Sequence, residues 1–326
     1  MSKTIDFSSI LAPYINGLIK EKRSLGYDYR TEELILLRFD NHCLEHGLET
    51  ISVTKPFLSD WCEQTKTEGV SNHNKRVTAV RQLMLFMASM GVHVYLPKCM
   101  SREDVVLPHI FTVKERNAFF NEVDNYRPLY PIPAYIRLSC EYRVLFRLIY
   151  CCGLRNTEAC GVPADCMDLE TGAITIYDSK GNKDRTVYMS DDLTELCKKY
   201  FAYLRDELGC HPTWFFPGRD PSKPLVNSSV NRVFNKFWFM TPNSEHCNNK
   251  PTVHDLRFSF VTDRINEWAL QGIDLNVMMP YLSCYLGHKG LQETYYYYHN
   301  SKQLHEVIRT NDKTSGKVIP EVVDYE

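Results

Sequence analysis

Four short stretches of this chain, far apart in the sequence, carry residues that together can bind and attack a phosphodiester. They are Gly153–Glu158, Lys180–Arg185, His254–Arg257 and Leu286–His288, the last followed by Thr294 and a tyrosine run that ends at His299. Arginine, lysine and histidine can surround a phosphate with charge and hydrogen-bond donors. A tyrosine hydroxyl downstream can attack it. Each stretch alone occurs often by chance, but their order and chemistry together predict a catalytic site.

Arg155 and Arg257 are the predicted phosphate clamp. Negative charge grows on the nonbridging oxygens of a phosphodiester as the nucleophile enters, and a guanidinium gives those oxygens paired hydrogen bonds at any working pH. His254 lies three residues before Arg257, which places both on one helical face. It is the candidate base, because a tyrosine hydroxyl with a pKa near about 10 needs help to lose its proton.

The order Arg, Lys, His-x-x-Arg, His, Tyr resembles that of the tyrosine recombinase family, the phage integrase and Xer-like enzymes that cut and rejoin DNA through a phosphotyrosine. The motifs lie in the last two thirds of the chain. By resemblance, Lys180 protonates the departing 5′ oxygen, with Lys183 as the alternative, and His288 donates a hydrogen bond to the phosphate. The resemblance implies no metal or nucleotide cofactor.

Four consecutive tyrosines, Tyr295 to Tyr298, compete for the role of nucleophile. In the family the nucleophile lies nine residues after the histidine of the Leu-Gly-His motif and two before another histidine. Given His288 and His299, both counts select Tyr297, with Tyr296 as the alternative. Neighbours on a helix point about 100° apart, so the other three should face core or solvent.

Further polar residues are candidates for supporting roles. Glu158 matches an acidic position of the family motif and is expected to orient an active-site group, although a simple helix-surface acid is the alternative. A predicted helix over 71–90 carries three basic residues, which suit either DNA contact or a solvated face. The candidate DNA contacts are Lys75, Arg76, Arg81, Lys183 and Arg185.

Length and composition favour a soluble two-domain protein. The chain has 326 residues, of which 44% are hydrophobic and 24% charged, as is ordinary for globular proteins. It has no apolar run of about 18 residues and no signal-peptide pattern, so we expect a cytoplasmic protein. The net charge of −2 argues mildly against nucleic acid, but acidic residues elsewhere, including Glu321, Asp324 and Glu326, can balance a basic face.

The twelve cysteines are scattered and show no C-x-x-C spacing, so we expect reduced, mostly buried thiols and no zinc site of that kind. His42, Cys43 and His46 resemble metal ligands in type. Their partner ligands are missing from the local sequence, and we therefore expect no metal.

The fold class expected is mainly α with a small β-sheet: a helical core-binding (SAM-like) DNA-binding domain over 1–95, a linker over 96–110, a mixed α/β catalytic domain over 111–300 and a tail over 301–326. Apolar periodicity predicts N-terminal helices over 10–20, 31–46, 54–65 and 71–90. Leu34, Leu37 and Leu44 are the predicted apolar face of the second, and Val77, Val80, Met84 and Met87 that of the fourth.

In the catalytic domain, Thr112 and Glu115 form a capping-box pattern that should open its first helix. A buried helix over 134–152 leads to Arg155. Strands over 173–177 and 186–189 flank a Gly-Asn turn, which places Lys180 at a hairpin tip. Further helices are predicted over 191–208, 228–238 and 252–268.

The resemblance implies a site-specific DNA recombinase or integrase that acts in the integration, excision or resolution of a mobile element. It implies a homotetramer on two double-stranded DNA sites, with a directionality factor as a further candidate partner. In the family, the segment after the nucleophile packs into a neighbouring subunit, although the tail can also fold onto its own monomer. Because the chain begins almost directly with the core-binding helices, we expect no additional arm-binding domain.

Two other functions remain open at this point. A type IB topoisomerase uses nearly the same chemistry, and supercoil relaxation by a monomer on arbitrary DNA would favour it. A DNA-binding regulator that has lost catalysis is the second, and trapping a covalent adduct would exclude it.

Overall fold

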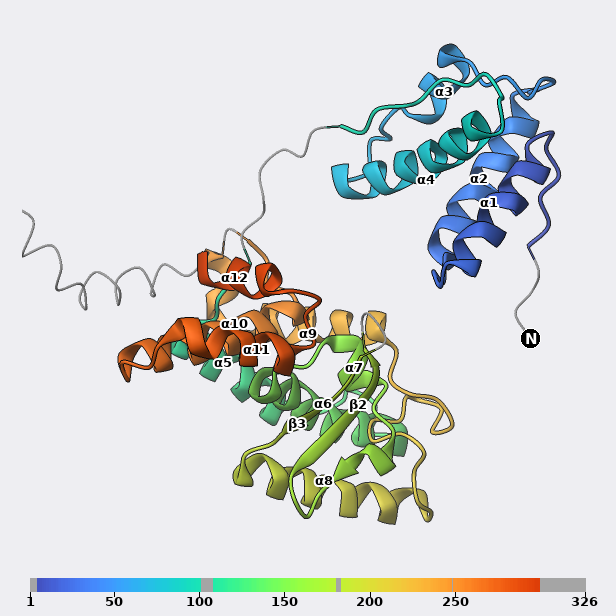
Figure 1. The fold of residues 1–326 in the computed structure, drawn as a ribbon. Helices are drawn as coiled ribbons and strands as arrows, with labels where there is room; N and C mark the ends of the chain where they lie inside the picture. Colours follow the sequence, from blue (N-terminus) through green and yellow to red (C-terminus); the bar gives the residue numbers. More distant parts are fainter. Residues whose placement is uncertain (1–4, 101–107, 180–182, 248, 300–326) are drawn as a thin grey trace, which may run out of the picture. The chain divides into compact units, whose positions relative to one another are not determined.

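A computed structural model of the chain describes residues 5–100, 108–179, 183–247 and 249–299. The chain forms two compact units, Met1–Val106 and Leu107–Glu326, drawn from blue to teal and from green to red in Figure 1. No helix within the described ranges is long and apolar enough to cross a membrane.

The N-terminal unit consists of four helices, as the apolar periodicity predicts. They are α1 (Ala12–Ser24), α2 (Arg30–Glu45), α3 (Lys55–Trp61) and α4 (Val70–Ser89). α3 is shorter than expected and ends at Trp61. The predicted inner face of α4 is confirmed, because Val77, Val80, Met84 and Met87 are all fully buried. α4 packs against both α1 and α2 and so forms the core of this unit.

The predicted apolar face of α2 is wrong. Leu34 and Leu44 are about half exposed, at 52% and 50%, and the buried residues of the helix are Leu36, Phe39, Asp40 and Cys43. Asp40 belongs to the buried face because its carboxylate accepts hydrogen bonds from the backbone N–H groups of Ser8 and Ser9. The apolar pattern of α2 did not reveal this face, because one of its residues, Asp40, is polar. Asp40 can be buried because it has hydrogen-bond partners, and these lie far away in sequence.

The C-terminal unit is mainly helical with one small sheet, which confirms the expected fold class. Its helices are α5 (Val113–Asn125), α6 (Pro133–Cys152), α7 (Asn156–Cys160), α8 (Asp191–Leu208), α9 (Asn227–Met240), α10 (Val253–Leu270), α11 (Leu275–Leu286) and α12 (Leu291–His299). Two short 3₁₀ turns, η1 (Ala164–Cys166) and η2 (Pro242–His246), complete the helical part. α7 and α11 are not among the helices that the sequence predicts.

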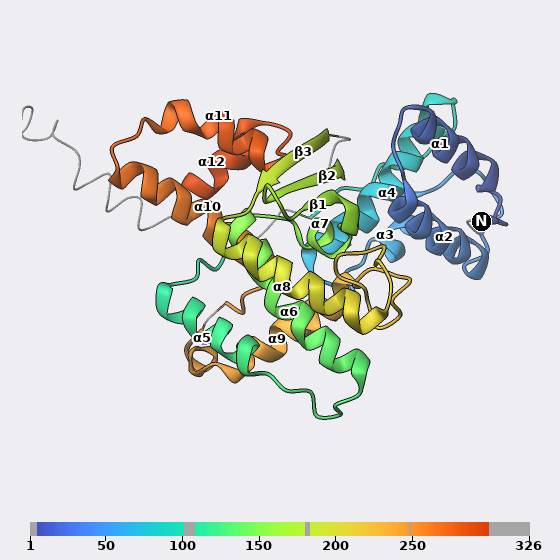
Figure 2. The ribbon, with the colours of Figure 1, turned by 90° about the horizontal axis from the view of Figure 1, so that it is seen from below.

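α6 is the central helix of this unit. It contacts α5, α7, α8 and α10, and Figure 2 shows the sheet on one side of α6 and the pair α5 and α9 on the other. The aromatic rings of Phe119, Phe146, Phe234 and Phe237 pack together between α5, α6 and α9. The predicted capping box of α5 is confirmed, because Thr112 and Glu115 exchange hydrogen bonds between side chain and backbone.

The sheet contains β1 (Met167–Asp168), β2 (Ala173–Ser179) and β3 (Lys183–Tyr188), paired antiparallel in that order. Ala173 pairs with Tyr188 at one end and Ser179 with Lys183 at the other. The predicted hairpin is therefore confirmed. Lys180 falls in its connection, which lies outside the described residues, and the side chain of Lys183 is not described either.

The twelve cysteines, all within the described residues, are free thiols, but most are not buried as expected. Only Cys43, Cys152, Cys160 and Cys197 are buried. The adjacent Cys151 is exposed, because successive positions on a helix point to different sides and only Cys152 faces the core.

Candidate active site

The motifs that begin at Gly153 and at Leu286 lie at the C-terminal ends of α6 and α11. Gly153, the residue after α6, has φ 62°, and Gly287, the residue after α11, has φ 64°. Both lie in the left-handed region, which glycine adopts without steric cost. A Cβ atom on Gly153 would also lie 2.5 Å from the ring of Phe260. The chain therefore leaves each helix abruptly, and the last carbonyls of both helices lack helical partners.

Both predicted clamp arginines bind these helix ends. Arg257 of α10 donates from Nη1 to the Gly153 carbonyl at 2.7 Å and from Nη2 to the Leu286 carbonyl at 2.8 Å. Arg155 donates from Nη2 to the Gly287 carbonyl at 2.8 Å. The arginines thus link the ends of α6 and α11 through backbone carbonyls.

Arg257 is almost completely buried, with 1% of its surface exposed. Burial lowers the pKa of its guanidinium, the charge of Arg155 lowers it further, and the neighbouring hydroxyl of Tyr297 acts in the opposite direction. Its Nε is buried and has no hydrogen-bond partner within the described part of the chain. One donor of a desolvated cation therefore remains for an anion, which is the property that phosphate binding requires.

Glu158 forms ion pairs with Arg155 and Arg185 and so fixes the orientation of both side chains. Its Oε1 accepts from Nη1 of Arg155 at 2.7 Å, and its two oxygens accept from both terminal nitrogens of Arg185 at 2.9 and 2.7 Å. Burial alone would raise the pKa of Glu158, but the hydrogen bonds and charge of Arg185, together with the hydrogen bonds of Arg155, outweigh it and lower the pKa to about 2. The geometry favours the predicted orienting role over that of a surface acid.

The side chain of Arg185 is buried in internal contacts, whereas the predicted DNA contact requires it to face solvent. Besides its bidentate pair with Glu158, its Nε donates to the carbonyl of Tyr285 at 2.9 Å. Its side chain is 7% exposed. Among the described residues its contacts are internal, so it supports the site through Glu158. The sequence offered no signal for this pair, because the two residues are 27 positions apart.

Replacing Glu158 by glutamine is expected to destabilise the C-terminal unit by about 3 kcal/mol at pH 7, since one pKa unit corresponds to about 1.4 kcal/mol. The folded pKa lies below the ordinary value of 4.5, so this stability is present above pH 4.5 and lost as the pH falls towards 2. Urea denaturation as a function of pH should therefore show the difference from the wild type narrowing in that window. Glu207→Gln, at an exposed position of α8, is the control, and an equal loss in both variants would contradict the prediction.

His288 lies between Arg257 and α12. Its Nε2 is 3.0 Å from Nη2 of Arg257, and its Nδ1 is 2.7 Å from the hydroxyl of Thr294. A guanidinium only donates hydrogen bonds, so Nε2 accepts and Nδ1–H donates to Thr294. In this arrangement His288 supports Arg257. Its donation to a phosphate, implied by the family resemblance, requires the ring to change partner and stays a prediction.

Of the tyrosines in the run whose side chains the structure describes, Tyr297 is the one whose ring stacks on His288. It is 5% exposed, and its ring stacks on His288 with centroids 5.6 Å apart and packs 4.3 Å from Phe258. Tyr296 is 38% exposed. The side chains of Tyr298 and His299 are not described. The geometry therefore favours Tyr297 over Tyr296, and Phe258 is a supporting residue that the sequence analysis missed.

His254 completes the described part of the cluster. It lies in the first turn of α10 with an exposed side chain, 5.2 Å from the ring of Phe258. A cavity of about 400 Å³ is lined by His254, His288 and Tyr297. Free N–H groups at a helix N-terminus favour anions. The fold thus brings together five of the six predicted catalytic residues, and the sixth, Lys180, lies outside the described residues.

The three basic residues of α4 differ in their exposure and in their contacts. Lys75 is exposed, and Arg81 donates to the carbonyl of Pro97 at 2.7 Å. Arg76 pairs with Glu68 at 2.8 Å and lies over the ring of Trp61. These internal contacts of Arg76 fit a structural role for that residue, while DNA contact by Lys75 remains a prediction.

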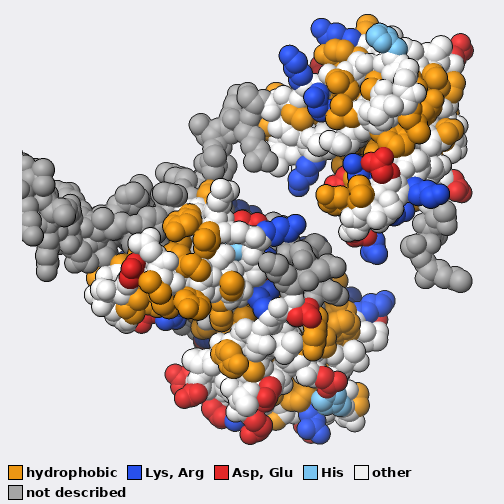
Figure 3. All heavy atoms as spheres, viewed as in Figure 1, with side chains coloured by type: hydrophobic (Ala, Val, Ile, Leu, Met, Phe, Trp, Pro, Cys, Tyr) orange, Lys and Arg blue, Asp and Glu red, His pale blue; other side chains and the backbone are white. Residues whose placement is uncertain are grey.

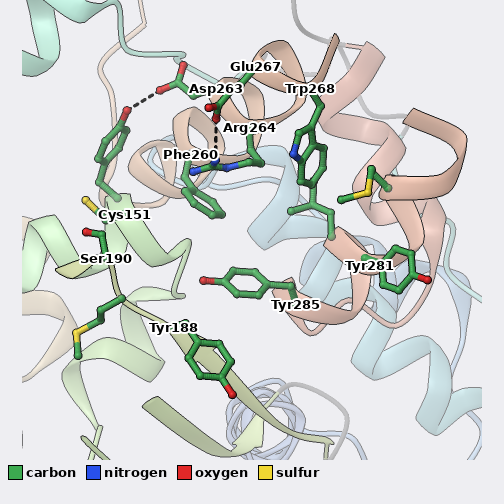
Figure 4. A pocket seen from close by; sticks show the side chains of 14 residues that line it. Cys151, Tyr188, Ser190, Phe260, Asp263, Arg264, Glu267, Trp268, Tyr281 and Tyr285 are labelled. Carbon is green, nitrogen blue, oxygen red and sulfur yellow. Dashed lines mark hydrogen bonds and ion pairs between the residues drawn. The ribbon is translucent and has the colours of Figure 1, made fainter. Parts of the chain in front are cut away.

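A second cavity, of about 600 Å³, lies between the end of α6, β3, α10 and α11. We call it the aromatic pocket and define it by Tyr188, Phe260, Trp268, Met278, Tyr281 and Tyr285. Figure 4 shows the rings of Tyr188, Phe260, Trp268, Tyr281 and Tyr285 around a common space, together with the Arg264–Glu267 ion pair. It contains none of the predicted catalytic residues.

The phage integrase family matches residues 120–304. A putative integrase/recombinase, y4eF of Sinorhizobium fredii, is 28% identical over 48% of this chain and 56% of its own length. The tyrosine recombinase XerC of Halalkalibacterium halodurans is 28% identical over 53% of this chain and 55% of its own length. The chain thus spans about half the length of these curated relatives.

Solved structures share the fold at low identity. The XerH site-specific recombinase in a post-cleavage complex with palindromic difH substrate has a TM-score of 0.62 at 18% identity and covers 91% of this chain and 83% of its own. A lambda integrase tetramer bound to a Holliday junction has a TM-score of 0.59 at 15% identity, with coverages of 88% and 79%.

Proposed function

The chain belongs to the phage integrase family, the tyrosine recombinases, and on that premise we propose that it cleaves and rejoins DNA at specific sites through a 3′-phosphotyrosine on Tyr297. The observation that carries the proposal is the contact of Tyr297 with His288 beside the buried guanidinium of Arg257. A buried tyrosine next to a desolvated cation with a free donor suits attack on a phosphate.

In the proposed reaction, Arg155 and Arg257 hold the nonbridging oxygens of the scissile phosphate. The Tyr297 hydroxyl attacks phosphorus, and His254 accepts its proton. The bond from phosphorus to the 5′ oxygen breaks, and Lys180 protonates that oxygen. The phosphotyrosine conserves the bond energy, so the reverse attack by a 5′ hydroxyl rejoins a strand without any external energy source.

The distribution of charge in the C-terminal unit is compatible with DNA binding despite the net charge of −2. Figure 3 shows acidic side chains gathered on the part of this unit where Figure 1 draws α8. The exposed acids of α8 are Asp191, Asp192, Glu195, Asp206 and Glu207. α8 contributes none of the residues of the proposed site.

We further propose that two double-stranded DNA sites and four copies of the chain take part, in integration, excision or resolution of a mobile element. The shared fold with an integrase tetramer on a Holliday junction supports this assembly. A directionality factor would be a further partner.

Covalent trapping tests the proposed function. Binding sites are first selected from a random duplex library with the full chain, and the selected site is then nicked near the cleavage position so that the cut strand diffuses away. A protein–DNA adduct that survives denaturation is expected. Relaxation of plasmids lacking the site would instead favour a type IB topoisomerase. Site-specific binding without an adduct would favour a regulator.

The aromatic pocket is our proposed acceptor for the segment after α12 of a neighbouring subunit. Residues 300–326 lie outside the described residues, but their sequence contains Val318–Val323, a stretch in which Glu321 is the one charged residue. Hydrophobic side chains gather over α11 and α12 in Figure 3, and Val277 and Tyr281 of α11 are 55% and 68% exposed. Such a surface favours a protein partner.

Deleting the chain after Thr310 is therefore expected to reduce tetramer assembly on paired DNA sites while binding to a half-site survives. Tyr281→Ser in the pocket should weaken assembly by roughly 30-fold, as for a buried aromatic anchor worth about 2 kcal/mol. Native gels of synaptic complexes measure both. Leu129→Ser, at an apolar position that is 83% exposed outside this pocket, is the control. Unchanged assembly of the truncated chain would contradict the connector role.

A further inference from the structure

Two histidines of α2 and one aspartate of α3 meet on the N-terminal unit. His42 and His46 are one helical turn apart with ring centroids 4.0 Å apart. Nε2 of His46 is 3.1 Å from Oδ2 of Asp60, and Nε2 of His42 is 3.8 Å from the same oxygen. The third member of the cluster, Asp60, comes from α3, which packs on α2 through Phe57 and Trp61.

The hydrogen bonds of His46 determine which nitrogen faces the aspartate. Nδ1 of His46 is 3.0 Å from the backbone carbonyl of His42. A carbonyl only accepts hydrogen bonds, so Nδ1 carries a proton. In the neutral ring, the lone pair of Nε2 then faces Oδ2 of Asp60, and two acceptors at 3.1 Å repel each other unless a cation or a proton lies between them.

A proton on Nε2 of His46 would give His46 and Asp60 a hydrogen bond but would leave His42 without a partner. Nε2 of His42 is buried and has no hydrogen-bond partner among the described residues, and at 3.8 Å it is too far from Asp60 for a hydrogen bond. A buried ring nitrogen without a partner calls for an explanation. One divalent cation placed among the three ligand atoms, which all lie within 4.8 Å of one another, would satisfy every one of them.

The surroundings hold the ligands in place and leave an entry path. The ring of His42 packs against Phe57 and Trp61, each with centroids 5.3 Å away. The side chains of His46 and Asp60 are 47% and 59% exposed. Cys43 does not belong to the cluster, because it is 1% exposed and packs into the apolar core of this unit.

We propose that His42, His46 and Asp60 bind Zn²⁺ with water as the fourth ligand, and that the ion clamps α3 to α2. Two imidazoles and a carboxylate are a common zinc ligand set, with bonds of about 2.0 to 2.2 Å. Tetrahedral bonds of that length separate ligand atoms by roughly 3.3 Å, close to the 3.1 and 3.8 Å seen here. The donation of Nδ1 of His46 to a carbonyl is the outer-shell contact that metal-bound histidines usually make. This site is separate from the proposed phosphotyrosine chemistry.

The test uses the full chain without a polyhistidine tag, after treatment with chelator. Zn²⁺ is titrated by calorimetry, and Co²⁺ serves as a spectroscopic substitute. We expect one ion per chain, visible Co²⁺ absorption typical of a tetrahedral site without a thiolate charge-transfer band, and a Zn²⁺-dependent rise in thermal midpoint. His46→Ala and Asp60→Asn, both at exposed positions, should each weaken binding by at least the roughly 10- to 100-fold that loss of an outer-shell partner costs.

His93→Ala is the matched control, since His93 is an exposed histidine of the same unit outside the cluster. It should bind Zn²⁺ like the wild type. Three results would each overturn the proposal: Zn²⁺ affinity unchanged in His46→Ala, a thiolate band in the Co²⁺ spectrum, or no binding by the wild type. Circular dichroism of each variant without metal confirms that it is folded, so that lost affinity reports the ligand and not the fold.

Discussion

Tyr297→Phe is expected to abolish the covalent DNA adduct and to leave DNA binding intact. The substitution removes only the attacking oxygen, because the phenyl ring keeps its stacking on His288 and its packing against Phe258. The measurement compares a denaturing gel of a nicked substrate with a mobility shift of the same DNA. Because the nucleophile is lost entirely, we expect no adduct rather than a slower one.

Tyr296→Phe is the matched control for this experiment. It changes the adjacent residue of the same helix, whose side chain is 38% exposed, and should form the adduct at a rate close to that of the wild type. An adduct formed by Tyr297→Phe but not by Tyr296→Phe would transfer the nucleophile to Tyr296 and show that the geometry around His288 is not that of the reacting complex.

Arg257→Lys should slow adduct formation by on the order of a hundred- to a thousandfold, the usual cost of one preorganised donor to a developing negative charge. Lysine keeps the charge but lacks the planar fork with which Arg257 reaches the carbonyls of Gly153 and Leu286. Affinity for DNA should fall only modestly, because many other phosphate contacts contribute to it. Single-turnover cleavage and a binding isotherm separate the two effects.

The folding of Arg257→Lys must also be measured, because the substitution changes the hydrogen-bond partners of the Gly153 and Leu286 carbonyls and of His288. Arg155→Ala provides a second test of the clamp, since its side chain is partly exposed, at 16%, and should be tolerated better. Arg205→Ala, at an exposed position of α8, is the control. Cleavage by Arg257→Lys at nearly the wild-type rate, in a folded protein, would remove Arg257 from the clamp.

Local signals in the sequence determined most of the elements. The helix predicted over 191–208 has the same bounds in the structure, and the long helix before Arg155 begins one residue earlier than predicted. The capping box at Thr112 and the hairpin between β2 and β3 follow from residues adjacent in the chain. Such features depend on interactions within a few residues, which a single sequence displays directly.

The sequence also determined which residue types take part in the site, through the order of the motifs. Only the tertiary structure decided what each one touches. It placed Tyr297 rather than Tyr296 on His288, and it paired Glu158 with Arg185 across 27 residues.

Contacts between residues distant in sequence also explain which features of the N-terminal unit the sequence did not predict. The inner face of α2 depends on Asp40 finding partners 31 and 32 residues earlier, and Asp60 reaches His46 only because α3 packs against α2. Side-chain partners distant in sequence are set by how helices pack, and a packing arrangement depends on all of its members at once. Local patterns therefore reveal helices and candidate chemistry, whereas the pairing of charges and ligands is a property of the folded chain.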